Sequence, residues 1–269
     1  MLSQKVFTSK SKDAISTFDD TILVTEIKAV VSSAGLSPDA ELKDSRGDLC
    51  RTFVISTSLR TGGATRMRTY DTLTADAFQG RIWEVARATS AAPTFFSPIY
   101  IGDVRYGDGG TGWNNPTKEA IAEAHNIWPN RPIGCVVSIG TGLEEALQLN
   151  DKSQEIPKFI ESILRKTSPK LAFQVAVAEY CVKCLTSCEN VHRELAENPE
   201  RIILDGNYFR LNVPQGMSKI GLDEWDKLED MIALSNNYMT HGDLLKPKQT
   251  IAKLLRKPQL TSLYSVRTL

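Results

Sequence analysis

The residues best placed to do chemistry lie at one glycine-rich turn. Asp108 follows Gly107 and precedes Gly109 and Gly110, so its carboxylate sits in a backbone with almost no side-chain bulk. Such a backbone can turn tightly and lets another group approach closely. Two interpretations are open: a carboxylate that takes part in chemistry, or a turn aspartate that binds the backbone of its own loop.

Short elements are predicted on both sides of this turn. Residues 99–101 and 104–106 have the pattern of two short strands joined by a two-residue turn. Downstream, Asn115 suits a helix N-cap and Pro116 suits the first helical position. Apolar residues then recur at the spacing of one buried helix face: Ala120, Ile121, Ala124 and Ile127. The sequence therefore places Asp108 between a strand and a helix, where α/β proteins often carry working residues.

The rest of the chain alternates between strand-like and helix-like segments. We expect residues 1–20 to be irregular and residues 36–50 to form a charged loop. The predicted strands are residues 51–58, 68–72, 135–139, 202–204 and 208–213. The apolar runs in 51–58 and 135–139 are typical of buried strands. The predicted helices are residues 25–34, 77–90, 157–164, about 170–197, 222–239 and 250–255. The small residues of 88–92 should let their segment lie close to a neighbouring strand.

Several blocks of this sequence resemble the patatin-like phospholipases, in particular their fungal members. They occur in the family's order over most of the chain, so the resemblance is specific. The blocks are Arg87-Ala88-Thr89-Ser90-Ala91-Ala92-Pro93, Asp108-Gly109-Gly110, Asn114-Asn115-Pro116, Glu123-Ala124 and Val137-Ser138-Ile139-Gly140-Thr141-Gly142. Weaker matches are Phe53-Val54-Ile55, Arg68-Thr69-Tyr70, Tyr208-Phe209-Arg210-Leu211-Asn212 and Leu222-Asp223-Glu224-Trp225.

The resemblance implies a three-layer α/β/α domain and a serine acyl hydrolase that works with a Ser-Asp dyad. It makes Asp108 the catalytic base, with Gly109 and Gly110 as the motif around it. The implied substrate is a phospholipid or another acyl lipid. The family's chemistry needs neither a metal nor a cofactor, so we expect none.

One departure from the family pattern affects the expected activity. The family's Gly-x-Ser-x-Gly turn, which carries the nucleophile, is absent from the 269 residues. Gly35-Leu36-Ser37 and Gly216-Met217-Ser218 begin the pattern, but Asp39 and Ile220 stand where the second glycine is required. We therefore expect one partial domain over residues 1–269, incomplete at its N-terminus and inactive as it stands. Its core motifs would span residues 51–142 and a C-terminal extension residues 150–256.

Other serines and glycines near the motifs favour structural roles. Ser56, Ser90 and Ser138 are more simply small packing or turn residues than nucleophiles. Gly140-Thr141-Gly142 follows a predicted strand, but Glu145 replaces the third glycine of a dinucleotide-binding loop. A turn that ends a strand accounts for this segment better than a phosphate-binding loop does.

Three functions remain as hypotheses after this reading. The first is a lipid acyl hydrolase, and the second is a non-catalytic patatin-like remnant that acts as a binding module. The third is a nucleotide-binding α/β domain that uses the loop at Gly140-Thr141-Gly142. In the resembled fold the missing strands are interior, so their neighbours would expose apolar edges and we expect self-association.

The amino-acid composition bears on the kinds of binding partner and on the cellular location that we expect. Lysine plus arginine and aspartate plus glutamate number 32 each, so no net field favours nucleic acid. The content of 41% hydrophobic and 24% charged residues is ordinary for a soluble globular protein. We expect a cytoplasmic or peripheral membrane protein, with possible membrane-surface contact through residues 152–170 weighed against a solvated charged face.

Five cysteines in a long chain argue against a disulfide scaffold. Cys181, Cys184 and Cys188 have a C-x2-C-x3-C spacing, with His192 one turn further on. This spacing allows a metal site, but it also places all three thiols on one helical face. We favour core packing, since buried cysteines behave as small hydrophobic residues.

Overall fold

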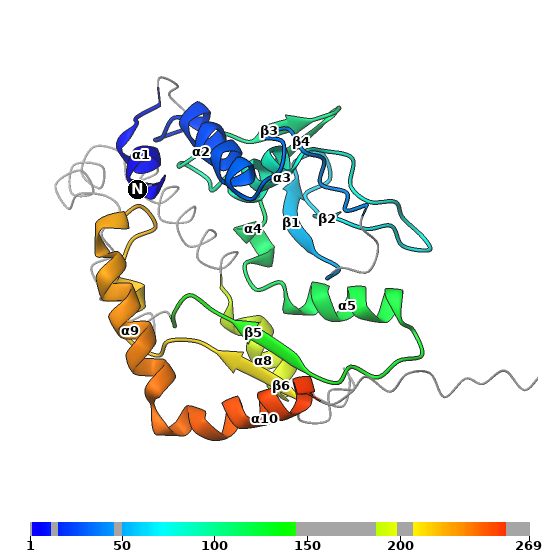
Figure 1. The fold of residues 1–269 in the computed structure, drawn as a ribbon, viewed down its shortest axis with the longest axis vertical. Helices are drawn as coiled ribbons and strands as arrows, with labels where there is room; N and C mark the ends of the chain where they lie inside the picture. Colours follow the sequence, from blue (N-terminus) through cyan, green and yellow to red (C-terminus); the bar gives the residue numbers. More distant parts are fainter. Residues whose placement is uncertain (1, 12–15, 46–49, 144–186, 198–206, 257–269) are drawn as a thin grey trace, which may run out of the picture.

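The computed structural model describes residues 2–11, 16–45, 50–143, 187–197 and 207–256 (Figure 1). Within these residues, helices and strands mix along the chain as the predicted α/β class requires. The strands are β1 (Phe53–Ser58), β2 (Ala64–Arg68), β3 (Ile99–Ile101), β4 (Val104–Asp108), β5 (Val136–Ile139) and β6 (Tyr208–Leu211). The helices are α1 (Leu2–Thr8), α2 (Asp20–Ser33), α3 (Ile82–Thr89), α4 (Gly110–Trp113), α5 (Thr117–Ile127), α8 (Glu189–Glu197), α9 (Leu228–Thr240) and α10 (Leu245–Arg256). Short 3-10 turns are η2 (Met217–Lys219), η3 (Trp225–Lys227) and η4 (Gly242–Leu244).

Four strands form an antiparallel sheet in the order β2-β1-β4-β3. The central pair is set in register by Ser56 opposite Asp108 and Ser58 opposite Tyr106. The β3–β4 hairpin turns at Gly102, whose positive φ of 58° suits glycine. This sheet therefore fixes the strand that ends at Asp108 between two neighbours.

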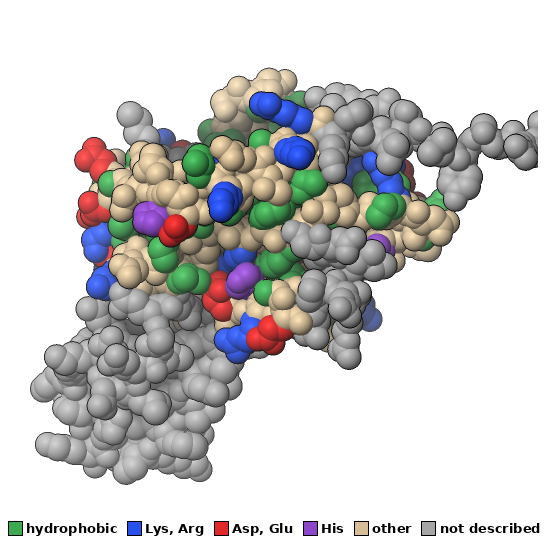
Figure 2. Space-filling view, turned by 90° about the horizontal axis from the view of Figure 1, so that it is seen from below, with side chains coloured by type: hydrophobic (Ala, Val, Ile, Leu, Met, Phe, Trp, Pro, Cys, Tyr) green, Lys and Arg blue, Asp and Glu red, His purple; other side chains and the backbone are tan. Residues whose placement is uncertain are grey.

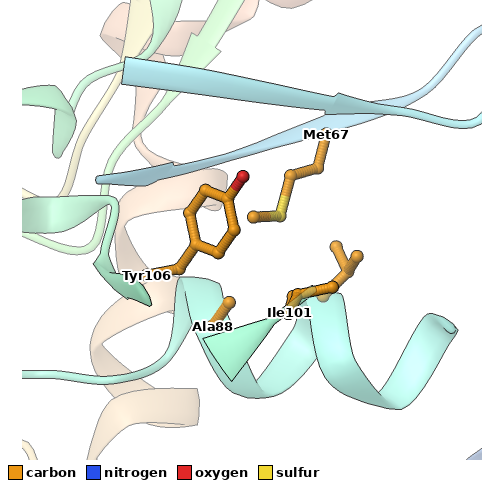
Figure 3. Packing of buried hydrophobic residues seen from close by; sticks show 5 residues of the cluster. Met67, Ala88, Ile101 and Tyr106 are labelled. Atoms are coloured by element: carbon orange, nitrogen blue, oxygen red, sulfur yellow. The ribbon is translucent and has the colours of Figure 1, made fainter. Parts of the chain in front are cut away.

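The main core lies between this sheet and helix α3 (Figure 3). Met67 of β2, Ile101 of β3 and Tyr106 of β4 meet Val85 and Ala88 of the helix. Met67 and Ala88 are completely buried. Because the alanine methyl is small, α3 can approach the sheet closely at this point.

The other two strands form a separate parallel sheet, in which β5 pairs with β6 (Figure 1). Ile121 of α5 and Leu195 of α8 form a small buried cluster, against which Val136 and Tyr208 pack. Helix α5 thus lies between the two sheets in Figure 1 and contributes to the packing beside the parallel one.

Several predicted elements are confirmed, although their ends differ. The strands predicted at 51–58, 99–101, 104–106 and 208–213 correspond to β1, β3, β4 and β6. The helices predicted at 25–34, 77–90, 222–239 and 250–255 correspond to α2, α3, α9 and α10. Helix α2 begins five residues earlier than predicted because Asp19 caps it, accepting a hydrogen bond from the Thr21 amide. Helix α10 also begins five residues earlier, at Leu245.

The prediction that residues 1–20 are irregular is wrong. Helix α1 forms there, and Val6 is buried in an aromatic cluster with Phe18 and Phe96. The Phe7 and Phe18 rings meet edge to face with their centroids 5.2 Å apart. Tertiary contacts with residues some ninety positions later hold this segment, so the local pattern could not reveal it.

Two further predictions about burial and boundaries are wrong. The second strand forms at Ala64–Arg68 rather than at 68–72, directly after the turn that follows β1. Residues 135–139 do contain a strand, but it is not buried on both faces, since Ile139 is 76% exposed. The strand predicted at 202–204 and the helix at 157–164 lie outside the described residues, as do most of 150–206.

Candidate active site

Asp108 is the last residue of β4, and the chain turns directly after it into α4. Its Oδ1 accepts a hydrogen bond from the Gly110 amide at 2.5 Å. This contact is the one expected of a turn aspartate. The second carboxylate oxygen has no hydrogen-bond partner among the described residues.

The backbone around Asp108 is fixed by three further hydrogen bonds. Ser56 Oγ donates to the Gly107 carbonyl at 2.6 Å, and Thr57 Oγ1 donates to the Asp108 carbonyl at 2.8 Å. The Asp108 amide donates to the Ala91 carbonyl at 3.3 Å. The carboxylate is thus held between β1 and the small-residue segment that follows α3.

Gly109 allows the closest backbone approach at this turn. A Cβ atom on Gly109 would lie 2.1 Å from the carbonyl oxygen of Ile55. The same oxygen accepts a hydrogen bond from Thr89 Oγ1 at 2.6 Å. The glycine turn is therefore packed backbone to backbone against β1, and the Thr89 side chain ties the end of α3 to the same strand.

Burial controls the proton affinity of Asp108. Desolvation raises the pKa of its carboxyl above the usual aspartate value, and the Gly110 amide opposes this effect only in part. No positively charged side chain among the described residues pairs with it. The carboxylate is therefore a stronger base than an exposed aspartate would be.

The serines near the motifs have structural partners. Ser56 is completely buried and donates to the backbone of β4. Ser138 is buried, and its Oγ accepts hydrogen bonds from Thr117 Oγ1 at 2.8 Å and Arg210 Nη1 at 2.9 Å. Ser90 is exposed at the end of α3. Among the described residues, no serine hydroxyl contacts the Asp108 carboxylate.

Three backbone amides of the loop after β5 already donate hydrogen bonds within the fold. The Gly140 amide donates to the Leu211 carbonyl at 2.8 Å, and the Gly142 amide donates to Asn212 Oδ1 at 2.7 Å. The Leu143 amide donates to the Val213 carbonyl at 2.8 Å. These bonds tie the loop to β6, which favours a strand-ending turn over the nucleotide-binding hypothesis.

Helix α5 is clamped to β2 by a buried acid that the apolar pattern did not indicate. Glu123 is 2% exposed, and Arg68 donates to both of its oxygens, Nε at 2.5 Å and Nη2 at 2.8 Å. Arg66 Nη1 and Tyr70 hydroxyl lie 3.2 and 2.9 Å from the same carboxylate. The predicted face was wrong at Ala120, which is exposed. The chain links this clamp to the Asp108 turn through the start of α5.

The predicted helix cap before α5 is close to its expected position. Asn115 is buried, and its Oδ1 accepts hydrogen bonds from the Thr117 amide at 3.2 Å and hydroxyl at 2.6 Å. Pro116 lies just outside the helix, which begins at Thr117. Asn115 therefore orders the chain between the Asp108 turn and α5.

No group of three or more histidine, cysteine or acidic side chains suited to a metal occurs in the described residues. Cys181 and Cys184 lie outside them, so the cysteine spacing stays a prediction. His192 Nδ1 lies 3.1 Å from the Tyr208 hydroxyl. In the same described ranges, no helix is both long and apolar enough to cross a bilayer.

Comparison with known proteins agrees with this arrangement. Residues 8–121 match the family model for patatin-like phospholipase. This range contains α3, the β3–β4 hairpin and the Asp108 turn. The fold and the site thus define a patatin-like α/β domain. The chain carries a patatin-like phospholipase domain, to which residues 8–121 belong.

The chain is similar to several phospholipases. It is 31% identical over 190 residues to the calcium-independent phospholipase A2-gamma of Mus musculus, covering 68% of this chain and 21% of that protein. It is 44% identical over 62 residues to phospholipase A I of Arabidopsis thaliana, covering 23% of this chain and 5% of that protein. It is 29% identical over 189 residues to the 85/88 kDa calcium-independent phospholipase A2 of Rattus norvegicus, covering 65% of this chain and 21% of that protein. The chain spans about a fifth of the length of the phospholipase A2 relatives.

Proposed function

We propose that this chain is part of a lipid acyl-ester hydrolase of the Ser-Asp dyad type, with Asp108 as the general base. The observation that carries the proposal is the half-buried Asp108 carboxylate at the end of β4, with one oxygen held by the Gly110 amide and a raised pKa. A base whose pKa is raised toward the working pH is well suited to proton transfer. The similarity to phospholipases A2 supports a phospholipid or a related acyl lipid as the substrate.

The proposed chemistry has two steps in which Asp108 carries a proton. A serine oxygen bonds to the ester carbonyl carbon while its proton moves to Asp108, and the proton passes to the alcohol as the ester C–O bond breaks. Water then adds to the acyl-serine and gives a proton to Asp108. The serine regains that proton as the fatty acid leaves. Proton transfer of this kind contributes about 10²–10⁴-fold to the rate.

The nucleophile of this dyad is not assigned to any serine of the 269 residues. The sequence contains no Gly-x-Ser-x-Gly, and Ser56 and Ser138 already hydrogen-bond within the fold. We propose that the dyad serine lies on a separate segment that contacts the glycine turn. The 269-residue chain alone would then have no esterase activity.

Hydrolysis of a p-nitrophenyl ester tests this proposal on the 269-residue chain. We expect wild type and Asp108→Ala to release p-nitrophenol at the same rate as buffer. Turnover by wild type that Asp108→Ala abolishes would show that a serine within these residues is the nucleophile, and would overturn the proposed separate segment.

A non-catalytic binding module is the second candidate, and the absence of Gly-x-Ser-x-Gly favours it. The two candidates differ in what a serine-bearing segment would do. In a hydrolase, the segment restores turnover that depends on Asp108, whereas in a binding module it does not. Binding of a fluorescent ATP analogue tests the nucleotide hypothesis, and we expect a flat titration because the loop amides are already bonded.

We also propose contact with membrane lipid at the protein surface, and self-association through β5. Strand β5 pairs with β6 along one edge, and among the described residues no strand pairs with the other edge. Ile139 and Val137 are exposed on the same side of this strand. An unpaired edge beside apolar side chains favours pairing with another chain.

A further inference from the structure

Helix α9 carries a line of exposed hydrophobic side chains. Leu228, Ile232 and Met239 are 57%, 51% and 40% exposed. Their spacings of four and seven residues place them along one side of the helix. A different side faces the protein, where the Tyr238 hydroxyl accepts a hydrogen bond from the Asn212 amide at 3.1 Å. The three exposed hydrophobic residues therefore lie on a side of α9 that does not pack against the protein through Tyr238.

Helix α10 is basic and carries no acid. Its four cations are Lys246, Lys248, Lys253 and Arg256, and all four are exposed. Leu245 and Leu255 of the same helix are also exposed. Figure 2 views the molecule from below Figure 1, the side on which α10 lies, and shows basic, acidic and hydrophobic side chains interspersed on this face. Neither α9 nor α10 has a buried residue.

The two helices form one defined corner (Figure 1). They are joined by His241 and the short turn η4, whose Leu244 is buried. Lys248 Nζ donates to the Met239 carbonyl at 3.0 Å and so links α10 to the last turn of α9. Among the described residues, no acidic side chain pairs with Lys246, Lys253 or Arg256. No acid of the described ranges therefore neutralises the charge of these three side chains.

We propose that α9 and α10 dock this protein on the surface of a bilayer that contains anionic lipid. The cations of α10 complement anionic headgroups, while the line on α9 and the exposed leucines of α10 enter the headgroup boundary. A hydrophobic line beside a basic helix is the combination that interfacial helices use. This surface places the membrane contact of the proposed function on α9 and α10, and the biological role of docking rests on that proposed function. Docking itself needs no turnover.

Co-sedimentation of the full 269-residue chain with vesicles tests this surface. The two vesicle preparations are phosphatidylcholine alone and equimolar phosphatidylcholine with phosphatidylserine. We expect binding to the anionic vesicles only. Lys246→Gln combined with Lys253→Gln should weaken that binding about tenfold or more, since each cation near an anionic surface contributes separately. Leu228→Ser combined with Ile232→Ser should weaken it by about tenfold as well.

Matched controls come from loops beside the four-stranded sheet. Leu73→Ser removes a leucine that is 96% exposed after β2, and Arg60→Gln removes an exposed cation in the turn between β1 and β2. Both variants should bind as wild type does. Equal binding by all variants, or no binding to anionic vesicles, would overturn the proposal. Loss of a dimer in the helix variants without any change in vesicle binding would assign the surface to a second copy instead.

The outcomes separate docking from hydrolysis. Vesicle binding that follows the variants, with no esterase activity even when a serine-bearing segment is present, supports docking and counts against the hydrolase alone. Asp108-dependent esterase activity in the presence of a serine-bearing segment, without vesicle binding, supports the hydrolase and overturns docking. Thermal melting followed by circular dichroism shows whether a variant that loses vesicle binding has unfolded. If one of the two double variants has unfolded, the vesicle binding of the other, folded double variant tests the proposal.

Discussion

At Asp108, burial and a single backbone amide act in opposite directions on one carboxyl group. Burial removes water from the carboxylate and raises its pKa, whereas the Gly110 amide stabilises the charge and lowers it. Burial is the larger effect. The folded protein therefore holds this proton more tightly than the unfolded chain does, which is the property a general base needs.

The raised pKa has a consequence for stability. Ionisation of Asp108 lowers the free energy of unfolding as the pH rises above the ordinary aspartate value of 3.8. Asp108→Asn removes the ionisable group, so the variant should have a higher free energy of unfolding than wild type at neutral pH. This difference in free energy should disappear below pH 3.8. Urea unfolding on both sides of that pH measures the gap. A variant less stable than wild type at neutral pH would show that the carboxylate is stabilised by the fold.

Gly109 and Gly107 give a matched pair of substitutions. The backbone at Gly109 is right-handed helical, with φ −66°, so only the clash with Ile55 opposes a side chain there. Gly109→Ala should lower the free energy of unfolding by about 1–3 kcal/mol through overpacking. Gly107→Ala meets only the Leu59 side chain at 3.5 Å and should stay within about 1 kcal/mol of wild type. Equal effects in urea denaturation would contradict the close approach.

Helix α5 is held to the four-stranded sheet by charged contacts. Its Glu123 holds Arg66, Arg68 and Tyr70 of a strand and loop more than fifty positions earlier. The Arg68 hydrogen bond is the main cause that lowers the pKa of Glu123, and burial opposes it. Burial and the Glu123 hydrogen bond raise the pKa of Tyr70 to about 12. The clamp thus fixes the helix that follows the Asp108 turn.

Removal of this clamp should be costly. Glu123→Gln leaves two partly buried guanidinium groups without their carboxylate and should lower the free energy of unfolding by about 3 kcal/mol. Glu119→Gln, which breaks the 2.7 Å pair of Glu119 with Arg66, should cost less than about 1 kcal/mol because that pair is more exposed. In wild type, the contribution of Glu123 is complete above pH 4.5 and is lost as the pH falls through its lowered pKa. Thermal melting across this range measures both effects, and equal losses in the two variants would contradict the clamp.

The sequence predicted elements with strong local signals and missed those set by distant contacts. Gly102 and the apolar residues around it predicted the β3–β4 hairpin, and Asn115 predicted the start of α5 within one residue. The pattern of apolar residues could not indicate Glu123, because its burial depends on arginines of another element. It could not indicate α1 either, since Val6 packs against the distant Phe96.

In the whole molecule, the described strands divide into two sheets rather than one. The resemblance to the patatin-like phospholipases predicted the α/β class and the role of Asp108, and the residue pattern placed Asp108 on a glycine turn between a strand and a helix. The local pattern of residues could not give the order of the strands, because β1 pairs with β4, a strand about fifty positions later in the chain. The apolar run at 135–139 suggested a strand covered on both faces, yet Ile139 is largely exposed.

The exposed side of β5 gives a prediction about assembly. The chain should form a dimer or larger species, and Ile139→Lys should shift it toward the monomer, because a charge on an edge strand opposes edge pairing. Sedimentation velocity at several concentrations measures this shift. The control is Leu73→Lys, at an exposed position outside both sheets. A monodisperse monomer in wild type would contradict self-association.

The role of Asp108 as the base is tested most directly by hydrolysis with a serine-bearing segment present. The longest reading frame that contains these residues should be searched for an in-frame Gly-x-Ser-x-Gly upstream of Met1, and its product assayed with a phospholipid and a p-nitrophenyl ester. We predict turnover by that product and a fall in kcat of about 10²–10⁴-fold for Asp108→Asn, with little change in KM. Undiminished turnover by Asp108→Asn would contradict the assignment of the base.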